Sequence, residues 1–246
     1  MVAARFDDVA LAATQVLKQL LLISFFALDG LLETILTVLQ EFGVFKGAIK
    51  AEYEKYLPFN RYDNLNILEI GILDGKSLLT WKDYYYRSNI LGIDINPDCK
   101  KFEEERISVE IGSQADGNFL SRTWQQYGPF DMILDDGSHM SSHMIYSFEH
   151  LFGSVKSGGV YVIEDIGCSY WEDYGGGYLN PGSSIEYFKR LSDDINFRGL
   201  MNFDYSNVHA RREDVLTDLS KQVQPGCKTD IESINFLNGI IIITKR

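Results

Sequence analysis

The chain has 246 residues, a formal net charge of −12 and 45% apolar residues, so it can bury the core of one domain with an appendage. The acidic balance argues against a nucleic-acid backbone as partner, because no basic stripe is available to neutralise phosphates. The three cysteines, Cys99, Cys168 and Cys227, are far apart and lack the spacing of a metal site. Such a set indicates a reduced, cytoplasmic protein rather than a disulfide framework.

The first sixty residues differ from the rest. Apolar residues recur at helical spacing between Leu28 and Gln40 and leave a polar opposite face, which predicts an amphipathic helix. The apolar run Leu20–Leu28 has only nine residues, too few to span a bilayer, and the start of the chain lacks the features of a signal peptide. We expect residues 1–60 to form a helical cap, or an oligomerisation or docking segment, and the protein to be a homo-oligomer without stable membrane insertion. Membrane association of this segment is the alternative.

Residues 61–246 alternate between apolar runs and amphipathic stretches. Strands are predicted over 65–71, 89–95, 107–112, 130–136, 159–165, 231–237 and 240–245, and helices over 76–87, 97–104, 116–127, 141–154 and 183–195. This alternation is typical of an α/β domain with a mostly parallel sheet covered on both faces. Asn238-Gly239 predicts a hairpin, and thus an antiparallel strand at the sheet edge. The glycine-rich run 174–178 predicts a mobile loop.

The first predicted strand leads into a glycine-bearing turn with the pattern Glu69-x-Gly71-x-x-x-Gly75. A dinucleotide site needs G-x-G-x-x-G, whose second glycine admits a pyrophosphate. Leu73 and Lys76 occupy the second and third glycine positions here, which disfavours a pyrophosphate. The turn instead suits a cofactor without phosphate groups.

The second predicted strand supports a nucleoside-type ligand. It ends in Asp94, about twenty residues beyond the turn, where a carboxylate can accept both ribose hydroxyls. An ordinary α/β unit with chance acids at its strand ends is the alternative. The E-x-G-x-x-x-G pattern resembles the first motif of class I S-adenosylmethionine (SAM) methyltransferases.

Two further strand ends are rich in acids. Asp135 and Asp136 open the sequence D-D-G-S-H, which ends in His139, while Glu164 and Asp165 follow the fifth predicted strand. If these strands are neighbours, Asp136, Glu164 and Asp165 converge and repel one another unless a cation lies among them. Oxygen ligands of this charge suit Mg²⁺. The alternative is that one acid is protonated or turned away.

Together these segments resemble metal-dependent sugar O-methyltransferases of macrolide pathways, such as those acting on mycinamicin and macrocin, and related cephalosporin hydroxylase-like proteins. The resemblance covers about residues 60 to 245 and is carried by Leu68–Gly71, Ser77–Trp81, Gly92–Ile95, Asp135–His139 and Tyr161–Asp165. It implies a Rossmann-like fold with a seven-stranded sheet, SAM and Mg²⁺ as cofactors, and methyl transfer to a hydroxyl of a natural product.

The resemblance also implies roles for single residues. Asp136, Glu164 and Asp165 would hold the metal, with Asp136 also at the catalytic centre, and His139 would be the general base. A helix-start residue bonded to backbone is the alternative for His139. His143 either orients the site or is solvated. The implied cofactor contacts are Glu69, Gly71, Gly75, Ser77, Asp94, Gln114, Asp116 and Asp135.

The acceptor is less defined by the sequence. Relatives usually carry a T-D-K-G-like segment before the first strand, whereas this chain has Val44-Phe-Lys-Gly47. Tyr170 and Trp171 are candidates for the substrate site, and packing at the sheet edge is the alternative for Trp171. The acceptor is either the sugar of a free glycoside or a carrier-bound polyketide intermediate. Two other functions are alternatives. A cephalosporin hydroxylase-like oxidative role would need an iron site with two histidines and one carboxylate. A non-catalytic SAM-binding module would not need the intact acids.

Overall fold

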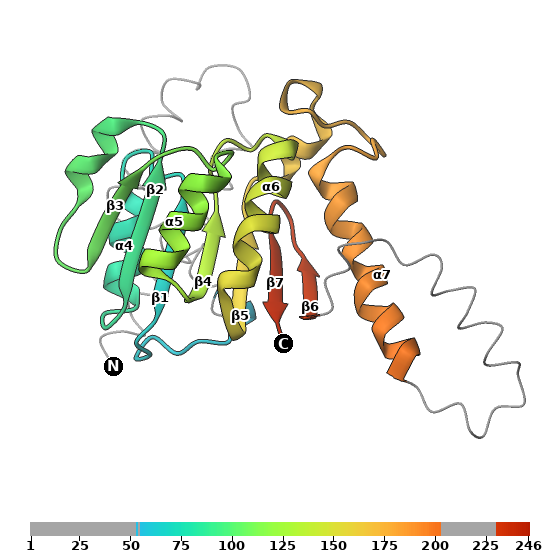
Figure 1. Ribbon diagram of the computed structural model, residues 1–246, viewed down its shortest axis with the longest axis horizontal. Coiled ribbons are helices and arrows are strands. Elements are labelled where there is room, and N and C mark those ends of the chain that lie inside the picture. Colours follow the sequence, from blue (N-terminus) through green and yellow to red (C-terminus); the bar gives the residue numbers. More distant parts are fainter. Residues whose placement is uncertain (1–52, 54, 203–229) are drawn as a thin grey trace, which may run out of the picture. The chain divides into compact units, whose positions relative to one another are not determined.

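Figure 1 shows the computed structural model, which describes residues 53, 55–202 and 230–246. The chain divides into two compact units, Met1–Leu57 and Pro58–Arg246, and the architecture below is that of the second unit. The predicted amino-terminal helices and Cys227 lie outside the described residues. Within the described ranges, no helix combines the length and apolarity needed to cross a bilayer.

One seven-stranded sheet with the strand order β3-β2-β1-β4-β5-β7-β6 forms the centre of this unit. The chain runs outward from β1 to β3 and then returns to β4, which pairs with β1. A ligand crevice is therefore expected outside the carboxyl ends of β1 and β4, where the strand order reverses. The parallel strands are β1 (Asn66–Ile70), β2 (Asn89–Asp94), β3 (Ile107–Ile111), β4 (Phe130–Asp135) and β5 (Val155–Ile163), and the carboxyl-terminal pair is β6 (Ile231–Phe236) and β7 (Ile241–Lys245).

Helices cover both faces of the sheet because side chains alternate along each strand. Leu91 and Ile93 of β2 join the core that packs against α5, α6 and α7. Gly92 faces the other way, where a Cβ atom would lie 3.1 Å from Leu78 of α4. The α-helices are α4 (Lys76–Tyr84), α5 (Gly117–Tyr127), α6 (Ser141–Leu151) and α7 (Ser184–Asn202), and the 3-10 helices are η1 (Pro97–Phe102), η2 (Phe152–Ser154), η3 (Ile166–Tyr170) and η4 (Glu172–Tyr174).

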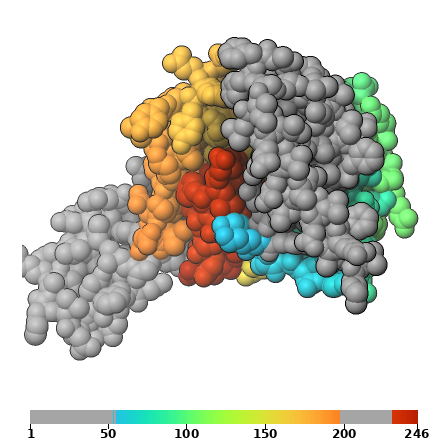
Figure 2. Space-filling model, turned by 180° about the vertical axis from the view of Figure 1, so that it is seen from behind, coloured from blue at the N-terminus to red at the C-terminus, as the bar shows by residue number. Residues whose placement is uncertain are grey.

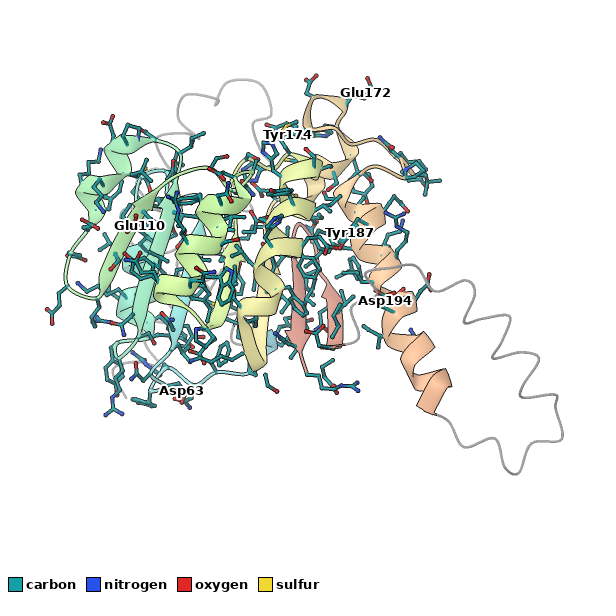
Figure 3. All side chains as sticks on the ribbon, in the orientation of Figure 1. Asp63, Glu110, Glu172, Tyr174, Tyr187 and Asp194 are labelled. Atoms are coloured by element: carbon teal, nitrogen blue, oxygen red, sulfur yellow. The ribbon has the colours of Figure 1, made fainter. Side chains whose placement is uncertain are left out.

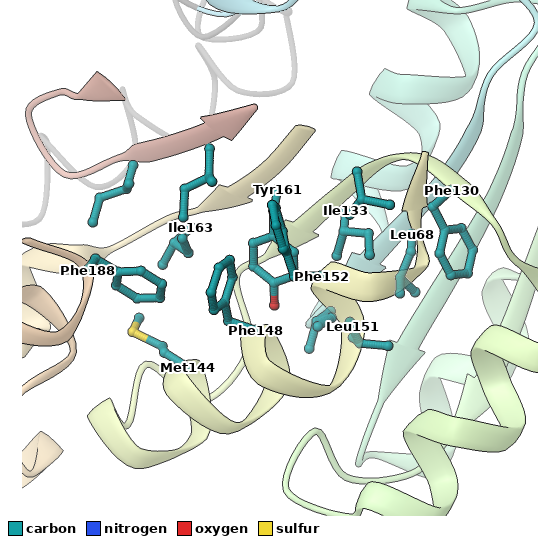
Figure 4. Close-up of a cluster of buried hydrophobic side chains, with 14 of the residues drawn as sticks. Leu68, Phe130, Ile133, Met144, Phe148, Leu151, Phe152, Tyr161, Ile163 and Phe188 are labelled. Atoms are coloured by element: carbon teal, nitrogen blue, oxygen red, sulfur yellow. The ribbon is translucent and has the colours of Figure 1, made fainter. Parts of the chain in front are cut away.

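Aromatic side chains fill the centre of the core (Figure 4). The Phe148 ring of α6 lies 4.9 Å from Phe152, 5.2 Å from Tyr161 and 5.3 Å from Phe188, measured between ring centroids. All four side chains are almost completely buried. Edge-to-face contacts of this kind add to the free energy gained by burying apolar surface. The cluster fixes α6 and α7 against β5, and so fixes the segments that surround the site.

The carboxyl-terminal hairpin confirms the turn predicted from Asn238-Gly239. Gly239 has φ +79°, and the Leu237 N–H donates to the Ile240 carbonyl across the turn. β7 pairs antiparallel with both β5 and β6. In the reverse view of Figure 2 the hairpin, in red, borders α7, in orange.

Three segments differ from their predicted form. Residues 97–102 form the 3-10 helix η1 rather than an α-helix, and α7 continues to Asn202 instead of ending near 195. β5 begins at Val155 rather than 159. The glycine-rich run after Tyr174 forms the predicted loop, in which Gly176 and Gly177 donate to the carbonyls of Trp171 and Ser169, and its mobility stays a prediction.

Candidate active site

Two glycines shape the turn after β1. Gly71 has φ +90°, and a Cβ atom there would lie 2.2 Å from the carbonyl oxygen of Asp136. Gly75 has φ +74° at the start of α4, and its Cβ would lie 2.6 Å from the Phe102 ring. Both positions require glycine because of contacts within the protein, in addition to any approach of a cofactor. The ends of β1 and β4 are therefore in direct backbone contact.

Asp94, at the end of β2, anchors the same turn. One carboxylate oxygen accepts the N–H groups of Ile72 at 2.8 Å and Leu73 at 3.3 Å, and the other accepts the Asn96 N–H at 2.8 Å. Burial alone would raise the pKa of Asp94, but these three N–H groups outweigh it and lower the pKa below the usual value. The carboxylate is thus held ionised. It keeps lone pairs that can accept ribose hydroxyls.

A cavity of about 190 Å³ opens at the point where the strand order reverses. His143 of α6 also faces this cavity, and its Nδ1 lies 2.8 Å from the Ser138 hydroxyl. The predicted cofactor residues Gly71, Asp94 and Gln114 all contribute to its wall. The structure thereby brings one part of the predicted cofactor set together.

Asp135 does not line this cavity, and its predicted role as a cofactor contact stays a prediction. Its side chain is completely buried, and its oxygens accept hydrogen bonds from Gln114 Nε2 at 3.0 Å, from Tyr161 at 3.1 Å and from Ser147. Its side chain is thus enclosed by protein groups in this structure. Its neighbour Asp136 points to the site instead, because consecutive residues at a strand end face opposite sides.

Asp116 is the N-cap of α5 and lies apart from the 190 Å³ cavity. Its carboxylate accepts the N–H groups of Asn118 at 2.9 Å and Phe119 at 3.2 Å. It lines a separate, open hollow together with Tyr146 and His150. The structure therefore gives Asp116 a capping role, which is a common role for aspartate at the start of a helix.

Three side chains form a candidate metal centre at the carboxyl ends of β4 and β5. Ligand atoms of Asp136, His139 and Asp165 all lie within 4.8 Å of one another. His139 Nδ1 is 3.9 Å from Asp136 Oδ1, and His139 Nε2 is 3.8 Å from Asp165 Oδ2. The backbone of His139 (φ +56°) and of Asp165 (φ +50°) is left-handed. Such strain in residues with side chains is concentrated at functional sites.

The charges of this centre are poorly compensated by the protein. Burial, followed by the charges of Glu164 and Asp165, raises the pKa of Asp136 to about 8. Burial is also the main cause that raises the pKa of Glu69 to about 8; Ser77 opposes this rise, and the charges of Asp136 and Glu164 add to it. In the described part of the chain, neither Glu69 oxygen has a hydrogen bond of ordinary geometry. A cation would stabilise all of these carboxylates in their ionised form.

The geometry fits a divalent metal. Atoms that share one Mg²⁺ at 2.0–2.1 Å lie at most about 4.2 Å apart, so the Asp136, His139 and Asp165 atoms need only a small closing movement. His139 Nδ1 is buried without a hydrogen-bond partner among the described residues, which is unusual for a polar atom unless a ligand completes it. The set holds one histidine, whereas the non-haem iron triad needs two.

Glu164 lies beside this group rather than in it. Its N–H donates to the Asp135 carbonyl at 3.0 Å, and its charge raises the pKa of both Glu69 and Asp136. The carboxylate is therefore close to the other acids, although its oxygens are outside the set that meets within 4.8 Å. Glu164 as a ligand stays a prediction, and the group that meets within 4.8 Å also contains His139.

An aromatic segment borders the acids. Trp171 is 60% exposed and Tyr170 is 45% exposed, so neither is packed in the core. Tyr174 was not singled out from the sequence, yet its ring lies 6.5 Å from His139 and 5.8 Å from Trp171. Figure 3 shows Tyr174 beside Glu172 in the segment after β5. The tyrosine, tryptophan and glycine residues over 170–178 are the sequence feature from which Tyr174 could have been predicted.

Proteins of known function resemble this chain. Demethylmacrocin O-methyltransferase of Streptomyces fradiae is 40% identical over 159 residues, which cover 60% of this chain and 40% of that protein. Mycinamicin VI 2''-O-methyltransferase of Micromonospora griseorubida is 38% identical over 159 residues, covering 60% of this chain and 39% of that protein. No family profile matches the chain.

A solved structure extends the similarity to the fold. The MycE methyltransferase of the mycinamycin biosynthetic pathway, in complex with Mg and SAH (S-adenosylhomocysteine), superposes with a TM-score of 0.65 at 30% identity over 79% of this chain and 49% of that one. The described domain therefore has the class I, Rossmann-like methyltransferase fold, as predicted. The chain spans about half the length of this structure and about 40% of the two curated relatives named above.

Proposed function

We propose that this protein is a SAM-dependent O-methyltransferase that uses a divalent metal and acts on a hydroxyl of a natural-product glycoside. The observation that carries the proposal is the group Asp136, His139 and Asp165 at the switch point of a methyltransferase fold, beside a cavity of about 190 Å³. The names of the similar proteins support the same chemistry, since both are O-methyltransferases, one of demethylmacrocin and the other of mycinamicin VI.

The chain's residues would divide the work as follows. When bound, SAM supplies an electrophilic methyl group and the metal supplies positive charge that lowers the pKa of the acceptor hydroxyl. Asp94 and the turn after β1 hold the nucleoside side of the cavity. His139 accepts the hydroxyl proton, which leaves the acceptor oxygen free to form its bond to the methyl carbon as the carbon–sulfur bond breaks. Holding both partners in line contributes through orientation.

Metal chemistry distinguishes the roles of His139 and Glu164. Mg²⁺ prefers oxygen ligands, so Asp136, Asp165 and Glu164 suit it better than an imidazole does. His139 then remains available as the base between the two aspartates, 3.8–3.9 Å from each. A softer ion such as Zn²⁺ would favour His139 as a ligand and would remove the base. We therefore assign Mg²⁺ as the working metal.

The exposed aromatic segment supports a large acceptor. Trp171 and Tyr170 present their rings to solvent, and Tyr174 connects Trp171 to His139. Aromatic faces beside a proton acceptor suit a sugar joined to an apolar aglycone. A carrier-bound polyketide offers the same hydroxyl chemistry, so an acceptor panel should contain both kinds.

The decisive experiment uses the full chain, methyl-labelled SAM and that acceptor panel. Methyl transfer should stop in excess chelator and return with Mg²⁺. Glu164→Ala should lose turnover while it still binds SAH in calorimetry, and His139→Gln should lose about 10²–10⁴-fold in rate. Glu172→Ala, in the exposed η4, is the control. Undiminished turnover in excess chelator would remove the metal from the proposal.

Self-association is a separate part of the proposal. As a helix, the amphipathic pattern between Leu28 and Gln40 would present more apolar surface than one small domain covers, and these residues lie outside the described part of the chain. Light scattering should show a smaller particle for a chain that begins at Lys46 than for the full chain. An unchanged oligomeric state would exclude this role for the segment.

A further inference from the structure

The turn that carries His139 is built on the side-chain amide of Gln114. The Ser138 N–H donates to Gln114 Oε1 at 2.7 Å. A Cβ atom on Gly137 would lie 2.1 Å from the same oxygen, so the backbone of the turn lies directly against the amide. The next residue, His139, is left-handed with φ +56°. A histidine keeps this conformation only where its surroundings fix it.

Gln114 is in turn held by the completely buried side chain of Asp135. Its Nε2 donates to Asp135 Oδ1 at 3.0 Å, and Gln114 is 7% exposed while Asp135 is fully buried. The other oxygen of Asp135 accepts from the hydroxyls of Tyr161 and Ser147, both also fully buried. The orientation of the Gln114 amide is therefore fixed at both ends, by a backbone N–H donor and by a carboxylate acceptor.

We infer that Asp135 is a positioning residue, which acts through Gln114 to hold the 137–139 turn and His139 in place. The inference rests on the proposed function for the role of His139, but the contacts themselves are independent of it. Asp135 lies on β4, one residue before Asp136, so the two aspartates divide two tasks between opposite sides of the strand end. Asp136 faces the other acids of the site, while Asp135 holds the 137–139 turn through Gln114.

The chemistry of the carboxylate explains why aspartate suits this position. Three donors are directed at the two Asp135 oxygens, so the carboxyl group acts as acceptor in every contact and admits one orientation of the Gln114 amide. Asparagine would present a donor as well as an acceptor, and the hydroxyls of Tyr161 and Ser147 can pair with either. When the asparagine NH₂ group faces Gln114, the Gln114 amide must be reversed. Its own NH₂ group then faces the Ser138 N–H, and two donors oppose each other. Asp135→Asn therefore loosens the turn without removing volume from the core.

The test is a double-mutant cycle on the full chain, with calorimetric affinities for Mn²⁺ and for SAH as readouts. Asp135→Asn should weaken Mn²⁺ binding by about 10-fold or more, because a loosened 137–139 turn also releases the adjoining ligand Asp136. In a Gln114→Ala background the same substitution should change the affinity less than 2-fold, because the link is already broken. Equal effects of Asp135→Asn in both backgrounds, or no effect in the native background, would overturn the inference.

Two controls separate positioning from general destabilisation and from failure of the proposed function. Asp131 lies on the same strand, and its carboxylate accepts hydrogen bonds from Lys156 Nζ and the Asn66 N–H. Asp131→Asn should lower the melting temperature without changing the Mn²⁺ affinity. A native chain that bound neither Mn²⁺ nor SAH would refute the proposed function alone. NMR resonances of the His139 ring, assigned by their loss in His139→Gln, would then decide. They should shift in Asp135→Asn and shift no further when Gln114→Ala is added to it. Unshifted resonances in Asp135→Asn would overturn the inference.

Discussion

Gly71 allows the backbone after β1 to lie against the backbone of Asp136. Replacing it with alanine places a Cβ atom 2.2 Å from the Asp136 carbonyl oxygen and strains a backbone with φ +90°. Backbone cannot yield as a flexible side chain can, so Gly71→Ala should lower the free energy of unfolding by about 3 kcal/mol or more. Chemical denaturation measures this loss.

Gly153 supplies the matched control for Gly71. A Cβ atom at Gly153 meets nothing within 4 Å. Gly153→Ala should therefore change the free energy of unfolding by no more than about 1 kcal/mol in either direction. Equal stability of the Gly71 and Gly153 variants would mean that β1 and β4 do not approach each other as closely as described.

Glu69 should make the metal-free protein less stable as the pH rises. Burial raises its pKa in the folded state to about 8 from an ordinary value of 4.5. Between these two pKa values the folded state holds a proton that the unfolded chain has lost. The contribution of Glu69 to stability is therefore greatest below pH 4.5 and is lost as the pH rises through 8. Glu69→Gln cannot lose a proton, and its melting temperature should fall less between pH 5 and pH 8.5.

Thermal unfolding in metal-free buffer at several pH values measures this difference. At pH 8.5 the glutamine variant should be the more stable protein, by several degrees in melting temperature. Glu172→Gln, on the exposed η4, should follow the native curve. Parallel curves for the native chain and Glu69→Gln would show that Glu69 does not titrate in this range.

The sequence predicted the candidate residues better than it predicted their separate tasks. Asp135 and Asp136 are adjacent acids at one strand end, and nothing in the letters alone says which one faces the site. The structure buries Asp135 beneath Gln114 and turns Asp136 toward His139. The contact of Tyr174 with His139 depends on three-dimensional packing, whereas the cap made by Asp116 is a local contact with residues 118 and 119.

At the scale of the element, β5 shows why the boundaries of a strand are harder to predict than its existence. The hairpin follows from its turn residues and is confirmed, and β4 and β5 are neighbours, as the predicted site required. The first four residues of β5 lie outside the predicted strand, because Lys156, Ser157 and Gly158 have little tendency to form strands. Gly158 has φ +76°, and the pairing of β5 with β4 shifts register there, so a bulge lets polar and glycine residues continue the strand.

Lys245 links three elements and should be important for their packing. Its ammonium group donates to the carbonyls of Phe152 at 3.2 Å, Gly153 at 2.9 Å and Val155 at 2.8 Å, which joins β7 to the connection between α6 and β5. The side chain is only 14% exposed. Lys245→Met should cost about 1.5–3 kcal/mol, because it leaves these carbonyls without their charged donor.

Urea denaturation measures the effect of Lys245→Met, and the slope of the transition should stay the same. Lys189→Met is the control, since Lys189 makes an exposed ion pair with Glu186 within α7. That substitution should change stability by less than about 0.5 kcal/mol. A similar loss in both variants would indicate that the carbonyls near Phe152 do not depend on the Lys245 ammonium.

At the scale of the whole molecule, an excess of negative charge makes the folded protein responsive to cations. The formal net charge is −12, and the acids at the ends of β1, β4 and β5 concentrate part of it at the site. Non-specific screening by salt and specific binding of a metal both relieve this repulsion. The two effects differ in their dependence on pH, because only specific binding requires particular carboxyl groups to lose their protons.

The affinity for Mg²⁺ should therefore rise between pH 6 and pH 8. The pKa of Asp136 and that of Glu69 are raised to about 8 by burial first and by neighbouring acids second, so protons compete with the metal throughout this range. Each proton displaced contributes up to about a tenfold gain in affinity per pH unit below the pKa. Calorimetry in buffers of different ionisation enthalpy would count the released protons. Chelation should lower the melting temperature more at pH 8.5 than at pH 6, whereas choline chloride at matched ionic strength should show no such difference. An Mg²⁺ affinity that is constant over this range would place the metal away from Asp136.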